Sequence, residues 1–189
     1  MRLVLATQNP GKVAEISDLL SPLEIEVESR PEGLPDTIED LDTLEGNAAK
    51  KAREVCEATG EPALADDTGL FVDALDGAPG VRTARYGGWR RLLREMIGIS
   101  RRSARFRTVL VLTHPDGRDD VVVEGVAEGT LTAEPCGEGG FGYDPVFVPT
   151  AGDGRTFAEM SKVEKNAISH RGLALRALLE ALDPESVGR

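Results

Sequence analysis

The sequence has few cysteines, which limits the chemistry it can perform. Its 189 residues include only Cys56 and Cys136, which lie far apart and have no partner at a metal-binding or redox spacing. We expect small buried thiols in a reducing compartment, because disulfides persist in oxidising ones. Cysteine is therefore excluded from the candidate chemistry.

Long hydrophobic runs are also absent. No segment approaches the ~20 consecutive apolar residues that a membrane-spanning helix needs. The apolar run at residues 3–6 is too short for a secretory signal, and polar residues interrupt it at once. We therefore predict a soluble cytoplasmic protein with no membrane partner.

Positive charge is scarce as well. The chain has 22 Lys and Arg against 33 Asp and Glu, a formal net charge of -11. Nucleic acids and acidic membranes require a basic face, so we expect no nucleic-acid partner. A small polyanion needs only a few well-placed cations, usually with a metal ion, so a nucleotide is not excluded.

What the sequence does contain is an alternation of strand and helix patterns. The expected strands cover residues 3–6, 23–27, 62–65, 109–112, 121–123, 129–133 and 146–148. The expected helices cover residues 10–20, 44–59, 89–99 and 162–182, the last beginning at a capping box of Ser161 and Glu164. This order predicts an α/β fold with a mixed β-sheet flanked by helices, in one domain over residues 1–189.

The first candidate site is the turn between the first strand and the first helix, Thr7-Gln8-Asn9-Pro10-Gly11-Lys12. Backbone N–H groups and the dipole at a helix N-terminus favour an anion, and Lys12 adds a full positive charge. The turn therefore suits a phosphate group. Simple capping by Asn9, with Lys12 solvated at the surface, explains the same residues equally well.

The second candidate is Asp66-Asp67-Thr68-Gly69, which follows the strand at residues 62–65. Because neighbouring side chains of a strand point to opposite faces, we expect only one aspartate at a given site. Carboxylates suit Mg²⁺, which usually takes one or two of them with phosphates and water. Glu39, in the acidic loop at residues 30–42, is a candidate second ligand. The structural alternatives are a turn and a solvated loop.

The third candidate is the glycine-rich stretch from Gly137 to Asp144. Its glycines allow a ligand close to the backbone, and Phe141 and Tyr143 offer flat faces on which a base can stack. Pro145 keeps Asp144 extended and fixes the direction of its carboxylate. A bulge-rich turn with core aromatics is the alternative, but we favour a binding loop.

The fourth candidate lies at the start of the last helix, where Lys165, Ser169, His170 and Arg171 gather. In a continuous helix Lys165 and Ser169 share a face, and the two following residues lie on adjacent faces. These four side chains can then line a pocket, but they cannot all point into the core. A lone histidine is more often structural than catalytic, yet its polar neighbours favour a binding role.

Six segments, in this order and spacing, resemble the inosine triphosphate pyrophosphatases, also called dITP/XTP pyrophosphatases. They are Leu-Ala-Thr-Gln-Asn-Pro-Gly-Lys, Thr-Leu-Glu-Gly-Asn-Ala-Ala-Lys-Lys-Ala, Ala-Asp-Asp-Thr-Gly-Leu, Gly-Ala-Pro-Gly-Val-Arg-Thr-Ala-Arg-Tyr, Gly-Gly-Phe-Gly-Tyr-Asp-Pro-Val-Phe and Glu-Lys-Asn-Ala-Ile-Ser-His-Arg. The resemblance covers nearly the whole chain. It implies a fold of two lobes with an elongated mixed β-sheet and the active site in the cleft between the lobes. It also implies a homodimer and Mg²⁺-dependent hydrolysis of ITP, dITP or XTP to the monophosphate and pyrophosphate.

The resemblance also implies roles for individual residues. It assigns the triphosphate to the Thr7 to Lys12 turn and Lys51, the metal to Glu39 and Asp67, and catalysis to Asp67 as general base or orienter of water. Thr68 would lie beside the substrate. The base pocket would consist of Phe141, Gly142, Tyr143, Asp144, Lys165, His170 and Arg171. Donors from His170 and Arg171 suit a 6-keto purine and mismatch the 6-amino group of adenine.

One departure from the family pattern lies between Tyr86 and Phe106, where the chain is shorter and residues 87–91 replace a longer polar loop. Two other functions are compatible with a nucleotide site. A related pyrophosphatase with another base preference is disfavoured by Ser169-His170-Arg171. A non-catalytic nucleotide sensor is disfavoured because it has no need for the metal and phosphate residues.

Overall fold

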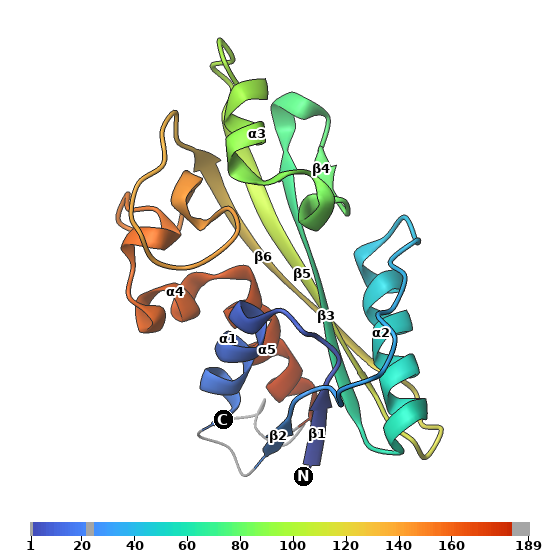
Figure 1. The fold of residues 1–189 in the computed structure, drawn as a ribbon. Coiled ribbons are helices and arrows are strands. Elements are labelled where there is room, and N and C mark those ends of the chain that lie inside the picture. The colour runs from blue at the N-terminus through green and yellow to red at the C-terminus, as the bar shows by residue number, and fades with distance from the viewer. Residues whose placement is uncertain (1, 22–24, 183–189) are drawn as a thin grey trace. The chain divides into compact units, whose positions relative to one another are not determined.

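The computed structural model describes residues 2–21 and 25–182 (Figure 1). Its strands are β1 (Arg2–Leu5), β2 (Glu26–Glu28), β3 (Ala63–Val72), β4 (Pro79–Gly80), β5 (Ser103–Thr113), β6 (Val121–Leu131) and β7 (Phe147–Pro149). Its α-helices are α1 (Pro10–Leu20), α2 (Leu44–Thr59), α3 (Gly88–Glu95), α4 (Lys162–Ile168) and α5 (His170–Leu182). Short 3₁₀ turns are η1 (Asp73–Leu75), η2 (Thr83–Arg85), η3 (Asp144–Val146) and η4 (Phe157–Glu159).

The described strands form one mixed sheet in the order β2-β1-β3-β5-β6-β7, and β4 pairs with β3. β1 pairs in parallel with β2 and β3, as helical crossovers require, with Leu3 opposite Val27 and Leu5 opposite Leu64. β4 and β7 pair antiparallel with β3 and β6. A mixed sheet with flanking helices confirms the predicted α/β class.

The chain divides into two compact units. The first contains Met1–Asp67, Thr108–Glu124 and Ala174–Arg189, and the second contains Thr68–Arg107 and Gly125–Leu173. In the first unit, α1 and α5 lie on one face of the sheet and α2 lies on the other (Figure 1). The core on the α1 and α5 side consists of Leu3, Leu5, Ile16, Leu20, Leu64, Leu110, Leu112, Ala174, Leu175 and Leu178.

The second unit has its own core, in which phenylalanines are prominent. The ring centroids of Phe106 and Phe147 lie 4.7 Å apart edge-on, and those of Phe147 and Phe157 lie 5.2 Å apart. Aliphatic residues surround them: Leu70, Val72, Leu92, Met96, Ala104, Ala127, Leu131 and Val146. Among the described residues of both units, no helix is long and apolar enough to cross a membrane.

Helices α1 and α2 match their predictions because nearby residues cap them. Asn9 accepts hydrogen bonds from the N–H groups of Gly11 and Lys12, at 3.0 and 3.3 Å. At α2, Thr43 accepts from the N–H of Gly46 at 3.0 Å, and Gly60 ends the helix with a φ of 69°. Such a left-handed residue favours glycine, so both ends of α2 are fixed locally.

Several predicted boundaries are wrong. β3 does not end at the aspartates but continues to Val72, because β4 pairs with its last residues and Leu70 N–H donates to the Thr83 hydroxyl. The separate strands expected at 121–123 and 129–133 are one strand, β6, and β5 is longer than predicted.

Three shorter elements also differ from expectation. α3 ends at Glu95, just before a left-handed Gly98. β7 begins one residue late, because the 3₁₀ turn Asp144–Val146 precedes it; Asp144 is therefore not extended, contrary to the expectation from Pro145. β2 covers Glu26–Glu28. Leu23, part of the predicted second strand, lies outside the described residues. Of the two free cysteines, Cys56 is buried as expected, but Cys136 is exposed.

The C-terminal helix is interrupted, which corrects a prediction about the fourth candidate site. Ser169 is extended, with φ -75° and ψ 155°, and separates α4 from α5. Its hydroxyl accepts from the N–H of Gly172 at 3.1 Å and so caps α5. The break redirects the chain, so Lys165, Ser169, His170 and Arg171 are all buried. The expectation that they cannot all point inward holds only for a continuous helix.

Candidate active site

A cluster of charged side chains in the first unit, two of them buried and Glu39 half-buried, joins α2, β3 and the acidic loop. The Lys51 Nζ lies 2.8 Å from Glu39 Oε1 and 3.2 Å from Asp67 Oδ1. It also donates to the backbone oxygen of Asp66 at 2.7 Å. Lys51 and Asp67 are 8% and 5% exposed, so this contact is shielded from water. The structure thus brings together three residues predicted for the site from three separate segments.

Asn47 connects the same cluster to the acidic loop. Its side chain accepts from the N–H of Leu41 at 3.1 Å and donates to the Leu41 carbonyl at 3.2 Å. The same amide donates to Asp67 Oδ2 at 3.4 Å, and the residue is fully buried. The sequence reasoning missed Asn47. A signal was available, because a buried asparagine is costly in a helix unless its amide finds partners.

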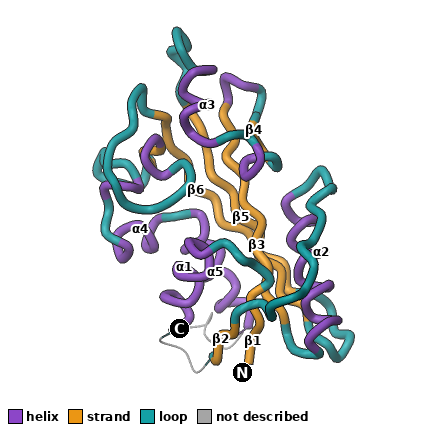
Figure 2. The backbone as a smooth tube through the Cα atoms, viewed as in Figure 1, coloured by secondary structure: helices purple, strands orange, loops and turns teal. Residues whose placement is uncertain are grey.

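The acidic loop is attached along α2 rather than simply solvated. It runs back beside the helix (Figure 2). The Thr37 hydroxyl bonds Glu54, and Lys50 Nζ contacts the Ile38 carbonyl at 2.8 Å and Asp40 at 2.9 Å. Together with Asn47 and Lys51, these side chains recur at the spacing of successive helical turns. One side of α2 therefore positions the loop that carries Glu39.

Asp66 and Asp67 have different partners, as their alternation in a strand predicts. Asp66 Oδ2 lies 3.0 Å from Lys12 Nζ, and the Asp66 side chain has no exposed surface. Lys12 belongs to α1, whereas Lys51 belongs to α2, and these helices lie on opposite faces of the sheet (Figure 1). Lys12 is thus partly buried and ion-paired rather than freely solvated. The role of Asp66 as its partner was not predicted.

The turn before α1 shows the capping arrangement. Besides the Asn9 cap, the Thr7 hydroxyl accepts from the N–H of Asn9 at 3.3 Å. Gln8, Asn9 and Pro10 are exposed, so a ligand can reach this turn. Capping is therefore established, while phosphate binding by the turn stays a prediction.

Burial changes the pKa values of the central pair. For Asp67, burial raises the pKa of the carboxyl and outweighs the attraction of Lys51. For Lys51, burial lowers the pKa, but the carboxylates of Asp67, Asp66 and Glu39 more than compensate, so the pKa is raised. Lys51 is therefore a cation at neutral pH, and ionised Asp67 carries a cost of desolvation.

This cost predicts a pH-dependent effect of Asp67→Asn on stability. A carboxyl with a raised pKa in the folded state destabilises the fold above that pKa, and the penalty disappears below the ordinary value of about 3.9. In metal-free protein, Asp67→Asn is therefore expected to raise the free energy of unfolding at pH 8, and to raise it less at pH 4.5. Urea unfolding at both pH values measures this. A larger gain at pH 4.5 contradicts the assigned cause.

A second cluster lies entirely in the second unit. Asp144 Oδ2 accepts from Lys165 Nζ at 2.6 Å and from the N–H of Phe141 at 2.8 Å. The Phe141 ring centroid lies 4.8 Å from Lys165 Nζ and 5.7 Å from the Arg171 guanidinium carbon. Arg171 also donates to the Thr68 hydroxyl at 3.2 Å. The structure thus connects these five predicted residues, with Lys165 and Arg171 over the ring of the half-buried Phe141.

Two other predicted site residues, Tyr143 and His170, are buried in the core of the second unit. Tyr143 is 6% exposed, and its hydroxyl donates to the Thr83 carbonyl at 3.1 Å. The His170 ring stacks on Phe106, with centroids 4.4 Å apart. These contacts favour the structural alternative for both side chains. Gly142 has a φ of 62° and open space around it, so it shapes the loop beside Phe141.

Two glycines allow the second cluster to form. A Cβ atom at Gly140 would lie 2.1 Å from Asp144 Oδ2, and one at Gly172 would lie 1.9 Å from the Asn166 carbonyl oxygen. Both distances are far shorter than any real contact. Gly140 therefore admits the Asp144 carboxylate, and Gly172 permits the turn between α4 and α5.

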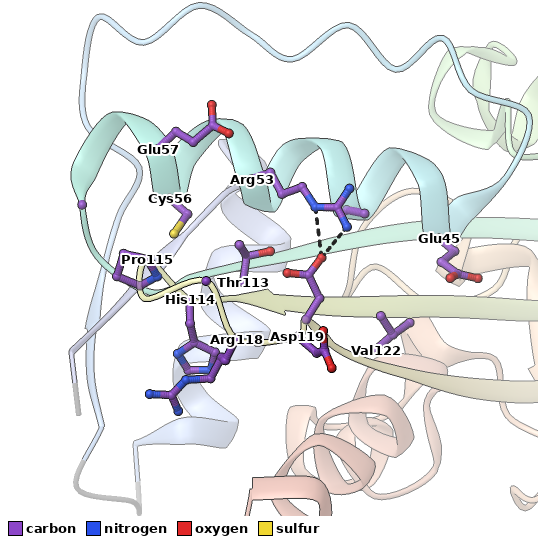
Figure 3. Close-up of a pocket in the computed structure, with 14 residues that line it drawn as sticks. Glu45, Arg53, Cys56, Glu57, Thr113, His114, Pro115, Arg118, Asp119 and Val122 are labelled. Carbon is purple, nitrogen blue, oxygen red and sulfur yellow. Dashed lines mark hydrogen bonds and ion pairs between the residues drawn. The ribbon is translucent and has the colours of Figure 1, made fainter.

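A separate groove of about 640 Å³ lies between α2 and the turn joining β5 to β6 (Figure 3). Arg53 crosses it to Asp120, with Nη2 and Oδ2 2.7 Å apart. None of the predicted site residues lines this groove. Its lining has four carboxylates and two arginines, and Arg118 also pairs with Asp116. The groove therefore does not suit a triphosphate.

Known proteins resemble this chain over almost its full length. The model of the Ham1 family matches residues 3–181. A Thermus thermophilus protein named dITP/XTP pyrophosphatase is 50% identical over 192 residues, covering 96% of this chain and 91% of the relative. One of the same name from Exiguobacterium is 45% identical, covering 97% and 98%. The structure of a HAM1 protein from Coxiella burnetii is 41% identical with a TM-score of 0.87, covering 97% of this chain and 99% of its own.

Proposed function

Because the chain belongs to the Ham1 family, we propose that it hydrolyses non-standard purine nucleoside triphosphates, namely ITP, dITP and XTP. One water is consumed, and the products are the nucleoside monophosphate and pyrophosphate. The observation that carries the proposal is the convergence of Glu39 and Asp67 on one buried ammonium, in the unit that also contains Lys12. Removal of faulty bases from the nucleotide pool is the corresponding cellular role.

Glu39 and Asp67 are the residues we assign to Mg²⁺. Their oxygens both face one cationic centre, and hard carboxylate oxygens are the ligands that Mg²⁺ prefers. Within residues 2–21 and 25–182, no group of three or more acidic, His or Cys side chains offers a larger metal site. Two carboxylates suffice, because substrate phosphates and water usually complete such a site. Bound Mg²⁺ supplies charge neutralisation for the phosphates.

Lys12, Lys51 and the Thr7 to Lys12 turn are assigned to the triphosphate. Phosphoryl transfer requires mainly positioning and charge neutralisation, and two lysines beside exposed backbone provide both. Asp67 orients the attacking water or accepts its proton. Its raised pKa supports this role, because a base whose pKa lies closer to the working pH transfers protons more effectively. We also assign to Thr68, the next residue of β3, a position beside the substrate.

The second cluster is assigned to the purine base. The ring of Phe141 provides a stacking face, and Arg171 and Lys165 provide N–H donors. These donors suit the 6-keto oxygen of hypoxanthine or xanthine. The 6-amino group of adenine leaves buried donors unpaired, which binding sites reject strongly. Gly142, Tyr143, Asp144 and His170 shape and hold this pocket.

Our proposals for the oligomeric state and the cellular location rest on the same family resemblance. We propose a homodimer that acts on the free nucleotide pool of the cytoplasm. The net charge of -11 supports a small-molecule substrate rather than a nucleic-acid partner.

A panel of nucleotides tests the base preference. We expect kcat/KM for ITP, dITP and XTP to exceed that for ATP by at least about 100-fold, the scale on which unpaired buried donors discriminate. GTP is also expected to be a poor substrate. Arg171→Met is expected to reduce the ratio of kcat/KM for ITP to that for ATP, whereas replacing the half-buried Arg155 by Met leaves this ratio unchanged. Equal rates on ATP and ITP contradict the proposal.

A further inference from the structure

Lys51 is an unusual candidate for binding phosphate, because its ammonium is fully occupied. A lysine has three N–H donors, and Lys51 has three oxygen partners within 3.2 Å, from Glu39, Asp66 and Asp67. Its side chain is 11% exposed, so water does not substitute readily for these contacts. In this arrangement Lys51 has no donor left for a substrate.

We propose that in the metal-free protein the Lys51 ammonium occupies the position between Glu39 and Asp67 that Mg²⁺ takes when it binds. Mg²⁺ then displaces the ammonium, which becomes available to the substrate phosphates. The inference rests on the proposed function, which supplies both the metal and the nucleotide. Mg²⁺ and the Lys51 ammonium repel each other when both lie in contact with the same two carboxylates, so binding of the metal disfavours the present contacts of Lys51. The flexible four-carbon stem of lysine allows its head group to move.

Displacement couples the binding of metal and nucleotide. A phosphate that attracts Lys51 away from Glu39 and Asp67 removes the competitor of Mg²⁺ and so raises its affinity. By linkage, Mg²⁺ raises the affinity for the phosphate by the same factor. Without a nucleotide, Lys51 stays paired with the buried carboxylate of Asp67 and the half-buried carboxylate of Glu39, which lowers the cost of burying the charge of Asp67. The site therefore favours metal only in the presence of substrate.

Two neighbouring lysines provide matched controls. Lys12 acts electrostatically on Asp67, but its ion pair is with Asp66 at 3.0 Å. Lys50 contacts the Ile38 carbonyl and the Asp40 carboxylate, which belong to the two residues that flank Glu39 in the loop. Removing Lys12 therefore tests the general effect of a lost positive charge, and removing Lys50 tests the effect of loosening the loop.

The test is calorimetric titration of Mg²⁺ alone into the metal-free, nucleotide-free full chain. Lys51→Met is expected to bind Mg²⁺ at least about tenfold more tightly than wild type, since a charge within about 4–6 Å shifts a carboxylate equilibrium by that order. Lys12→Met is expected to give a gain below about threefold, and Lys50→Met no gain. Lys51→Gln is a second neutral variant in case Lys51→Met fails to fold.

Equal Mg²⁺ affinity in Lys51→Met and wild type overturns the inference. So does an equal gain in Lys12→Met and Lys51→Met, because that result indicates a charge effect without displacement. Pyrophosphate release from dITP by wild type is measured separately. If wild type releases pyrophosphate but Lys51→Met binds Mg²⁺ no more tightly, the inference fails and the proposed function stands. If wild type releases none, the proposed function fails whatever the Mg²⁺ affinities.

Discussion

Asp67→Asn is expected to lower kcat by about 10²–10⁴-fold, the usual contribution of a positioned general base. The amide keeps the shape of the side chain, and its oxygen can still accept from Lys51 or Asn47. It cannot accept a proton from water, and it is a poor ligand for Mg²⁺. Because the carboxylate is costly to ionise at this buried position, the variant is expected to fold at least as well as wild type.

Glu57→Gln is the matched control for this variant. Glu57 is an exposed carboxylate on the same helix as Lys51, at the groove that lacks the predicted site residues. Its replacement by an amide is expected to leave kcat and stability unchanged. Retention of more than about a tenth of wild-type kcat by Asp67→Asn contradicts the assigned role. Circular dichroism and unfolding curves separate a catalytic loss from a folding defect.

Among the proposed variants, Lys165→Met is expected to lose the most stability, about 3–5 kcal/mol, because it removes the ammonium that neutralises the buried Asp144 carboxylate. The two side chains are 6% and 4% exposed and lie 2.6 Å apart. The Asp144 carboxylate also holds the N–H of Phe141, so the loop under the proposed base pocket is affected as well. Urea unfolding of the full chain measures the loss.

A double variant distinguishes the broken pair from a packing defect. Asp144→Asn with Lys165→Met removes both charges, so it is expected to recover part of the stability that Lys165→Met loses. Arg155→Met is the surface control. Its partners Asp153 and Glu164 are exposed, so the loss is expected to be far smaller. A double variant less stable than Lys165→Met contradicts the account of this pair.

The sequence predicts best those elements whose ends are fixed by adjacent residues. Asn9 and Pro10 define the start of α1, and Thr43 with Gly60 defines both ends of α2. The break at Ser169 escaped detection because apolar residues keep helical spacing from Ile168 to Leu182. Serine is a good N-cap, but this preference is a weaker signal than the helical spacing of the apolar residues around it.

The candidate site was partly predictable for a similar reason. Side chains alternate between the two faces of β3, so Asp66 and Asp67 point in opposite directions whatever the rest of the fold. In the structure Asp66 pairs with Lys12 and Asp67 pairs with Lys51. The contacts of Asn47 with Leu41 depend on the path of a loop that has no periodic pattern. Likewise, the burial of Tyr143 and His170 depends on partners far away in the sequence, Thr83 and Phe106.

The most direct test of the proposed function is the product of dITP hydrolysis. With Mg²⁺ present, wild type is expected to release one pyrophosphate for each dIMP formed, with no orthophosphate before a pyrophosphatase is added. Asp67→Asn is expected to release pyrophosphate and dIMP far more slowly than wild type. Orthophosphate as the first product, or no hydrolysis of dITP by wild type, contradicts the account.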